Sequence, residues 1–413
     1  MVTPWPDSAW WLRRQDELLS FGRNFPIEVG AGYLDERGVP MPTEPPGTTE
    51  LYVTCRMTYV YSLAHLAGDQ HALPLVAHGL ASLTGSLYDH EFGGWHAKVS
   101  PQGPVISTKE AYGHAFVLLA TASACATGVP EARPLLDQAI AVFEQHFWDH
   151  ESGMVVESWD RTWSECENYR GVNANMHTTE AFFAVALATG DDVWRQRALG
   201  ILRNVIAWAY EFNGRLPEHF TPQWEPQLDY NEDSPAHPFR PYGATVGHWF
   251  EWSRLAVQAY TSELLGGRGA ESQWLLDGAQ YLYDAAVRDG WAVDGAPGFV
   301  YTVDFGGRPV VRQRMHWVAA EAVGAAAALR IATDDPRFAS DETTWWGYID
   351  EYMIDGSGSW IHELDARNVP AGTVWPGKPD LYHAVQATMV PRLPLWPPLA
   401  FALRDSAPPQ PPN

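Results

Sequence analysis

The sequence predicts an all-α protein built as an (α/α)6 barrel, with short β-hairpins and long loops at the barrel mouth. Three observations lead to this prediction. Apolar residues recur at helical spacing over about twelve stretches, and Gly-rich segments with strand-like alternation separate alternate stretches. A basic or imidazole side chain also stands near the start of every second stretch. Together these features indicate helix pairs that repeat and close into a ring.

The predicted helices follow one another along the whole chain. Ala181, Phe182, Val185 and Ala186 illustrate the spacing that places apolar side chains on one helix face. The last stretch contains four prolines between positions 391 and 398, which we expect to break it. The expected ranges are 8–23, 48–67, 70–88, 109–127, 131–148, 174–189, 192–212, 244–265, 269–289, 314–332, 335–355 and 380–404.

Between alternate helices lie segments rich in glycine and β-branched or aromatic residues. They are YDHEFGGWHAKVS from Tyr88, WDHESGMVVESWD from Trp148, EFNGRLPEHF from Glu211, GFVYTVDFGGRPVV from Gly298 and DGSGSWIHEL from Asp355. Each of them favours a short hairpin or an extended turn. The repeating unit is therefore helix, helix, hairpin.

One basic or imidazole residue near the start of each even-numbered helix gives the repeat a second signature. Successive residues of this series are separated by 58, 63, 71, 68 and 67 positions. A near-constant period predicts that the even helices form the inner ring and gather these side chains at one mouth. A chance distribution of 15 histidines is the alternative. The series is Arg56, His114, His177, His248, His316 and His383.

Composition limits the partners and the compartment. The formal net charge of -23 disfavours binding to nucleic acid and to anionic membranes, and a neutral ligand remains compatible with it. Cys55, Cys125 and Cys166 form no C-x-x-C pair, which argues against a disulfide scaffold or a thiolate zinc site. Neither a signal peptide nor a long apolar stretch is recognisable, so we expect a cytoplasmic protein.

No linker divides the chain, so we expect a single catalytic domain over residues 1–413. The stretches 23–47 and 221–243 are rich in proline and glycine but fall within the repeat. Loops of this length often carry function, and we expect both to lie over the barrel mouth. The oligomeric state, a monomer or a small homo-oligomer, is left open.

Two even helices share the motif H-x-x-E, in His177 with Glu180 and in His248 with Glu251. Residues three apart lie on one helix face, where a carboxylate can hold an imidazole in place as a general base. A buried histidine that is merely satisfied by a carboxylate is the structural alternative. A metal site is a weaker alternative, because no H-x-x-x-H motif accompanies the pairs, and we expect no metal.

His383 and Arg56 could act on a developing anion. Asp380 could cap the short helix that carries His383 in its first turn, and a helix N-terminus stabilises negative charge. Arg56 could bind a substrate oxygen as its charge grows, or it could form a salt bridge between helices.

The motifs of nucleotide cofactors and of serine hydrolases are missing. The chain has no G-x-G-x-x-G after a strand, no P-loop and no G-x-S-x-G elbow. We therefore expect no cofactor.

Six segments resemble the superfamily that includes N-acylglucosamine 2-epimerase, cellobiose 2-epimerase and the mannose-type aldose–ketose isomerases. The resemblance covers nearly the whole chain and favours the isomerase branch, with mannose isomerase and sulfoquinovose isomerase. The segments are CRMTY from Cys55, KEAYGHAF from Lys109, YRGVNANMHTTEAF from Tyr169, PYGATVGHWFEWSRL from Pro241, RMHWVAAEA from Arg314 and WPGKPDLYHAVQATMVPRLPL from Trp375.

The resemblance implies an (α/α)6 barrel and a set of site residues. His248 and His383 would be the acid/base pair, and Glu251 would orient His248. His177 and Arg56 would bind the substrate or assist ring opening. Residues expected to contact the sugar are Tyr112, Asn173, Arg240, Trp317 and Gln386, and the repeat and the H-x-x-E motif add His114 and Glu180.

The expected function is a cofactor-free aldose–ketose isomerase that acts on a monosaccharide. It would interconvert D-mannose and D-fructose, with D-lyxose and related sugars as further candidates. A proton would move between C1 and C2 through a cis-enediolate. The alternatives are a sugar 2-epimerase, a sulfoquinovose isomerase, an inverting glycoside hydrolase with two carboxyl groups, and a sugar-binding protein without catalysis.

Overall fold

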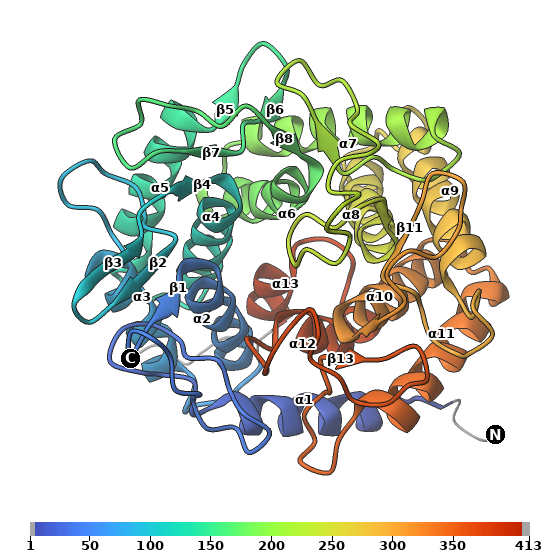
Figure 1. Ribbon diagram of the computed structural model, residues 1–413, viewed down its shortest axis with the longest axis horizontal. Coiled ribbons are helices and arrows are strands. Elements are labelled where there is room, and N and C mark those ends of the chain that lie inside the picture. Colours follow the sequence, from blue (N-terminus) through green and yellow to red (C-terminus); the bar gives the residue numbers. More distant parts are fainter. Residues whose placement is uncertain (1–4, 407–413) are drawn as a thin grey trace.

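The computed structural model describes residues 5–406 and confirms the predicted (α/α)6 barrel. The first four and the last seven residues of the expected domain 1–413 lie outside the described residues. Helices form two concentric rings around a central axis (Figure 1). Within residues 5–406 the inner ring consists of α2 (Leu51–Leu66), α4 (Ala111–Ala126), α6 (Val172–Thr189), α8 (Val246–Leu265), α10 (His316–Thr333) and α12 (Tyr382–Met389).

The outer ring alternates with the inner one along the chain (Figure 1). The outer helices are α1 (Ser8–Gly22), α3 (Leu73–Thr84), α5 (Ala132–His146), α7 (Val193–Glu211), α9 (Gln273–Gly290) and α11 (Pro336–Tyr348). Each helix of the two rings lies within its predicted range, except that α6 starts two residues early and α9 and α10 each end one residue late.

The last predicted stretch is broken, as its prolines predict. Helix α12 passes into the 3₁₀ turn η2 (Val390–Arg392), and the chain resumes as α13 (Leu399–Ser406), which contacts α2 and α4. Helix α11 likewise continues as a π-helical turn, η1 (Ile349–Met353).

Sequence composition explains which helices lie inside. In α4, 14 of 16 residues are buried, because alanines and other small or apolar residues occupy every face. In α5 only 5 of 15 residues are buried, and they form one apolar stripe. Polar side chains inside the inner helices bond to their own backbone, as Thr121 does to the carbonyl oxygen of Val117 at 2.7 Å. Inner helices can therefore be enclosed on all sides.

Short strands fix the start of the inner helices at the mouth. Five antiparallel ladders each join the strand that precedes an inner helix to a strand that follows the next outer helix. They pair β1 (Thr49–Glu50) with β2 (Lys98–Ser100), β4 (Lys109–Glu110) with β7 (Ser158–Trp159), β8 (Arg170–Gly171) with β9 (His219–Phe220), β10 (Ala244–Thr245) with β11 (Thr302–Val303), and β12 (Arg314–Met315) with β13 (Glu363–Leu364).

The ring closes through a sixth pairing between the two ends of the chain. Backbone atoms of Leu34 and Lys378 exchange two hydrogen bonds of 2.9 Å, just before α12. Some Gly-rich segments also form the hairpins that the sequence predicts, such as β5 (Trp148–Asp149) with β6 (Met154–Val155). The strand β3 (Gly103–Ile106) extends the first ladder. Within residues 5–406, no helix is both long and apolar enough to cross a lipid bilayer.

Candidate active site

A cavity opens among the first turns of the inner helices. All six inner helices contribute to its lining. Eight of the twelve predicted site residues line it, namely Arg56, Tyr112, Asn173, His177, His248, Glu251, Trp317 and His383. The other lining residues are Tyr52, Pro238, Phe239, Tyr301, His316, His362, Trp375, Pro379 and Asp380.

His383 is held as a neutral base by two neighbours on α8 and α10. Its Nδ1 lies 2.8 Å from Oε1 of Glu321, and the Nε of Arg254 donates to the other oxygen of Glu321 at 2.9 Å. Because a carboxylate accepts, the proton of the ring sits on Nδ1 and the lone pair sits on Nε2. Burial, followed by the positive charge of Arg56, keeps the pKa of His383 well below its ordinary value.

Asp380 holds the start of α12, but from the residue before the N-cap, which is Leu381, and not as the predicted cap itself. Its Oδ1 accepts from the backbone N–H of Tyr382 at 2.9 Å, and its Oδ2 accepts from Arg56 at 3.0 Å. The same carboxylate thus orients both the helix that carries His383 and a cavity cation.

His248 uses Glu218 as its carboxylate partner, and the expectation that Glu251 orients it is wrong. The Nδ1 of His248 lies 2.9 Å from Oε2 of Glu218, which directly precedes β9. His248 is the third residue of α8, and helical side chains lean toward the N-terminus. The ring therefore turns toward the mouth, where Glu218 lies, and away from Glu251 one turn deeper.

Glu251 and His177 face each other deep in the cavity. Oε1 of Glu251 lies 3.6 Å from Nδ1 of His177, beyond hydrogen-bond range. Burial, followed by the charge of Arg56, holds the pKa of His177 well below its ordinary value. His177 therefore enters the cavity as a neutral imidazole.

Arg56 and Trp317 supply the remaining contacts that a sugar needs. Arg56 donates to the Tyr112 hydroxyl at 2.9 Å in addition to Asp380. The ring of Trp317 lies between the two acid/base candidates, 5.2 Å from the His248 ring and 5.6 Å from the His383 ring. A flat apolar face flanked by two imidazoles and a guanidinium suits a polyhydroxy ligand.

Comparison with known proteins decides the family. A sequence profile of the N-acylglucosamine 2-epimerase (GlcNAc 2-epimerase) family matches residues 30–387. The chain belongs to this family.

Relatives within the family narrow the class of enzyme. A D-mannose isomerase of Thermobifida fusca is 50% identical over 380 residues, which cover 91% of each chain. A D-mannose isomerase of Pseudomonas cannabina pv. alisalensis is 45% identical over 95% of this chain and 94% of its own. A crystal structure of D-mannose isomerase superposes with a TM-score of 0.85 at 26% identity, covering 94% of this chain and 98% of that one. The protein is thus an enzyme, an isomerase of the N-acylglucosamine 2-epimerase family.

Three of the residues expected to bind sugar lie behind the cavity wall. His114 bonds to backbone through both ring nitrogens, with Nδ1 at 2.8 Å from the carbonyl of Glu110 and Nε2 at 3.1 Å from the N–H of Trp95. Glu180 accepts from the Tyr382 hydroxyl, one helical turn deeper than His177. Gln386 is buried one turn below His383. These three residues lie on the predicted inner helices, but their depth or their helix face keeps their side chains out of the cavity.

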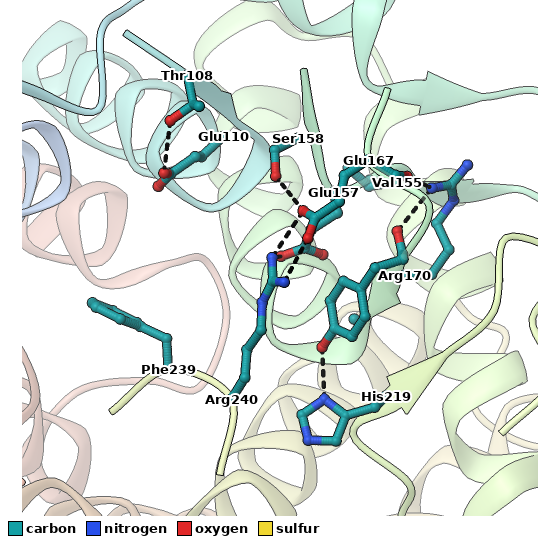
Figure 2. Close-up of polar contacts among 12 residues, drawn as sticks. Thr108, Glu110, Val155, Glu157, Ser158, Glu167, Arg170, His219, Phe239 and Arg240 are labelled. Atoms are coloured by element: carbon teal, nitrogen blue, oxygen red, sulfur yellow. Dashed lines mark hydrogen bonds and ion pairs between the residues drawn. The ribbon is translucent and has the colours of Figure 1, made fainter. Parts of the chain in front are cut away.

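Arg240, the fourth such residue, anchors the long loop instead of entering the cavity. Its guanidinium donates to both oxygens of Glu167, at 2.6 and 2.9 Å (Figure 2). It also stacks on the Tyr169 ring at 4.1 Å. The preceding residue, Phe239, packs against the Tyr52, Tyr112 and Trp375 rings with centroid distances of 5.7, 5.7 and 4.9 Å. The stretch 221–243 therefore lies at the mouth as expected, with Pro238 and Phe239 as its cavity residues.

Sequence reasoning missed the two carboxylates that orient the histidines. Glu321 is the one acidic side chain in the Ala-rich α10, a signal that could have marked it. Glu218 lies in the segment EFNGRLPEHF, where nothing in the sequence singles it out.

Donor atoms that could bind a metal do occur near the cavity floor. Ligating atoms of His177, Glu180 and Glu251 lie within 4.8 Å of one another, as do those of Glu251, Glu321 and His383. The guanidinium of Arg254 lies among these carboxylates and supplies the positive charge there. We therefore assign no metal ligands, and the expectation of a metal-free enzyme stays a prediction.

Proposed function

We propose that this isomerase interconverts D-mannose and D-fructose by moving a proton between C1 and C2. The observation that carries the proposal is a pair of imidazoles, His383 and His248, each with Nδ1 beside a buried carboxylate and with no hydrogen-bond partner at Nε2 among residues 5–406. They flank Trp317 in one cavity. The identity of 50% and 45% to two D-mannose isomerases supports the choice of sugar.

Ring opening is the first step. Mannose reacts as its open-chain aldehyde, so a proton must leave the anomeric hydroxyl and reach the ring oxygen. His248, oriented by Glu218, takes this role in the proposal. A general acid–base group in position contributes about 10²–10⁴-fold in rate.

Carbon-to-carbon proton transfer is the second step. Nε2 of His383 removes the proton from C2 of the aldehyde, a cis-enediolate forms, and the same nitrogen returns the proton to C1. A neutral imidazole is required for the removal, which agrees with the lowered pKa of His383. The guanidinium of Arg56 stabilises the enediolate oxygen, an interaction of about 3 kcal/mol in comparable sites.

A neutral sugar fits better than a sulfonated one. Recognition of a sulfonate would call for a free cation, whereas Arg240, one of the residues expected to contact the sugar, donates to both oxygens of Glu167. Sulfoquinovose is therefore the weaker substrate candidate.

Substitution of each histidine tests the proposal. We expect His383→Ala and His248→Ala each to lose at least about 10²-fold in kcat on D-mannose, with the fold confirmed by circular dichroism. His114→Ala, on an inner helix but outside the cavity, is the matched control and should keep kcat within a few-fold. Retained isomerisation in a folded His383 or His248 variant would remove that residue from the chemistry.

Product analysis tests the reaction itself. Proton NMR of a D-mannose incubation should show D-fructose as the product. Glucose without fructose would mean epimerisation at C2 and would overturn the proposal, as would the absence of any turnover.

A further inference from the structure

Three buried carboxylates surround the guanidinium of Arg254 beneath the cavity, and one of them, Glu251, lines it. The Nε of Arg254 lies 2.9 Å from Glu321, and its two terminal nitrogens lie 3.8 Å from Glu180 and 3.7 Å from Glu251. None of the three carboxylates is more than 6% exposed. Three negative charges against one positive charge in a dry interior are costly, so at least one carboxyl group keeps its proton.

Hydrogen bonding decides which carboxyl group keeps it. Glu321 accepts from Arg254 and from His383, and Glu180 accepts from the Tyr382 hydroxyl, so both have donors that favour the ionised form. Neither oxygen of Glu251 has a hydrogen-bond partner among residues 5–406. The proton therefore belongs to Glu251.

The electrostatic surroundings of Glu251 agree with this assignment. Burial, followed by the charge of Glu321, raises the pKa of Glu251 well above its ordinary value. The positive charges of Arg254 and Arg56 oppose this rise in pKa only in part. The charged and titratable groups around Glu251 are Glu180 and His177 on α6, Arg254 on α8, Glu321 on α10, Tyr382 and His383 on α12, Arg56 on α2 and Tyr112 on α4.

The position of Glu251 suits direct contact with the reacting sugar. Its side chain lines the cavity, and its carboxyl oxygens lie near both His177 and His383. A neutral carboxyl group can donate from one oxygen and accept at the other at the same time. Both oxygens of Glu251 are buried, and neither is engaged by another group of residues 5–406.

The reaction itself needs a group with this property. While His383 moves a proton from C2 to C1, O1 must gain a proton and O2 must lose one. We propose that Glu251 is a neutral carboxylic acid that carries the proton from O2 to O1 of the open-chain sugar. This inference rests on the proposed isomerase function and adds a catalytic residue to it.

The proposed step balances in protons and electrons. The O–H bond of Glu251 breaks as O1–H forms, and O2–H breaks as a new O–H bond forms on the other oxygen of Glu251. The side chain ends neutral, as it began. Within the sugar C1 is reduced and C2 is oxidised, so no external oxidant or reductant takes part.

Glu251→Gln tests the role because an amide of nearly equal size can donate and accept but cannot release a proton here. We expect kcat on D-mannose to fall by about 10²–10³-fold while KM changes less than threefold. Glu251→Asp, which restores a carboxyl group, should regain part of the lost kcat. Glu342→Gln is the matched control, since Glu342, on the outer helix α11, is a buried carboxylate bound to Arg330 at the end of α10.

Two further measurements separate this role from a structural one. The infrared spectrum of the wild-type protein at neutral pH should contain a protonated-carboxyl band that Glu251→Gln removes and that alkaline pH abolishes. The wild-type kcat should fall at alkaline pH, and this limb should be missing in Glu251→Gln. A purely structural Glu251 would lower thermal stability without changing the pH profile.

Clear results would overturn the inference. A folded Glu251→Gln that keeps kcat within threefold, or a Glu251→Asp no more active than the amide, would exclude the shuttle. A wild-type protein without the band would exclude the neutral acid even if Glu251→Gln does not fold. Lack of any mannose turnover by the wild type would refute the proposed function, and the infrared test of Glu251 would still stand by itself.

Discussion

Replacing Glu321 by glutamine should invert the protonation of His383 while leaving the fold in place. In the native structure one oxygen of Glu321 accepts from Arg254 at 2.9 Å and the other from Nδ1 of His383 at 2.8 Å. Arg254 can only donate, so it selects the amide oxygen of a glutamine. The amide NH2 then faces His383 and donates to Nδ1. The proton of the ring must move to Nε2, where the base is needed.

The expected loss of kcat follows from the loss of the correct tautomer of His383. An equivalent carboxylate-to-amide change beside a catalytic histidine lowers kcat by about 10⁴-fold in the serine proteases. For Glu321→Gln we expect a loss of about 10³–10⁴-fold in kcat, or about 4–5 kcal/mol of transition-state stabilisation. Stability should change little, because the bond to Arg254 is kept.

The assay measures initial rates of fructose formation from D-mannose. Circular dichroism and thermal melting serve as fold controls. Glu342→Gln again serves as the control, because Glu342 accepts from the Nε of Arg330 at 2.7 Å far from the histidines. A folded Glu321→Gln with more than a tenth of the wild-type kcat would refute the assignment of Nε2 as the base.

Two other perturbations probe the surroundings of the site. Burial raises the pKa of Glu157 to about 7, so wild-type stability should fall as pH rises from about 4.5 to about 7. Glu157→Gln should remove this fall, so that its free energy of unfolding relative to the wild type rises by at most about 3 kcal/mol between pH 4 and pH 8. Denaturant unfolding measures this difference, and parallel pH profiles of variant and wild type would contradict the prediction. Exhaustive treatment with EDTA should change kcat less than twofold, because Arg254 supplies the positive charge among the buried carboxylates, and an activity loss that a divalent ion restores would show otherwise.

Much of the site could be anticipated because each inner helix repeats the same position at the mouth. His177, His248 and His383 come from helices far apart in the chain. Their near-constant spacing was enough to predict that they share one cavity. The same logic failed for His114, which shares the period but points at the backbone of a hairpin. The spacing of the repeat defines the position of a residue along its helix only roughly. A shift of one position along an α-helix rotates the side chain by about 100° around the helix axis.

Sequence alone determined the local features: helix spans, the alternation of enclosed and one-sided helices, and the imidazoles near the start of the inner ones. These depend on contacts between residues three or four apart, which the chain itself specifies. Only tertiary structure decided which carboxylate meets which imidazole. Glu218 lies 30 residues before His248, and Glu321 lies 62 residues before His383. Packing between separate segments formed those pairs and the ion pair of Arg240 with Glu167, and it left Glu251 without a hydrogen-bond partner among residues 5–406.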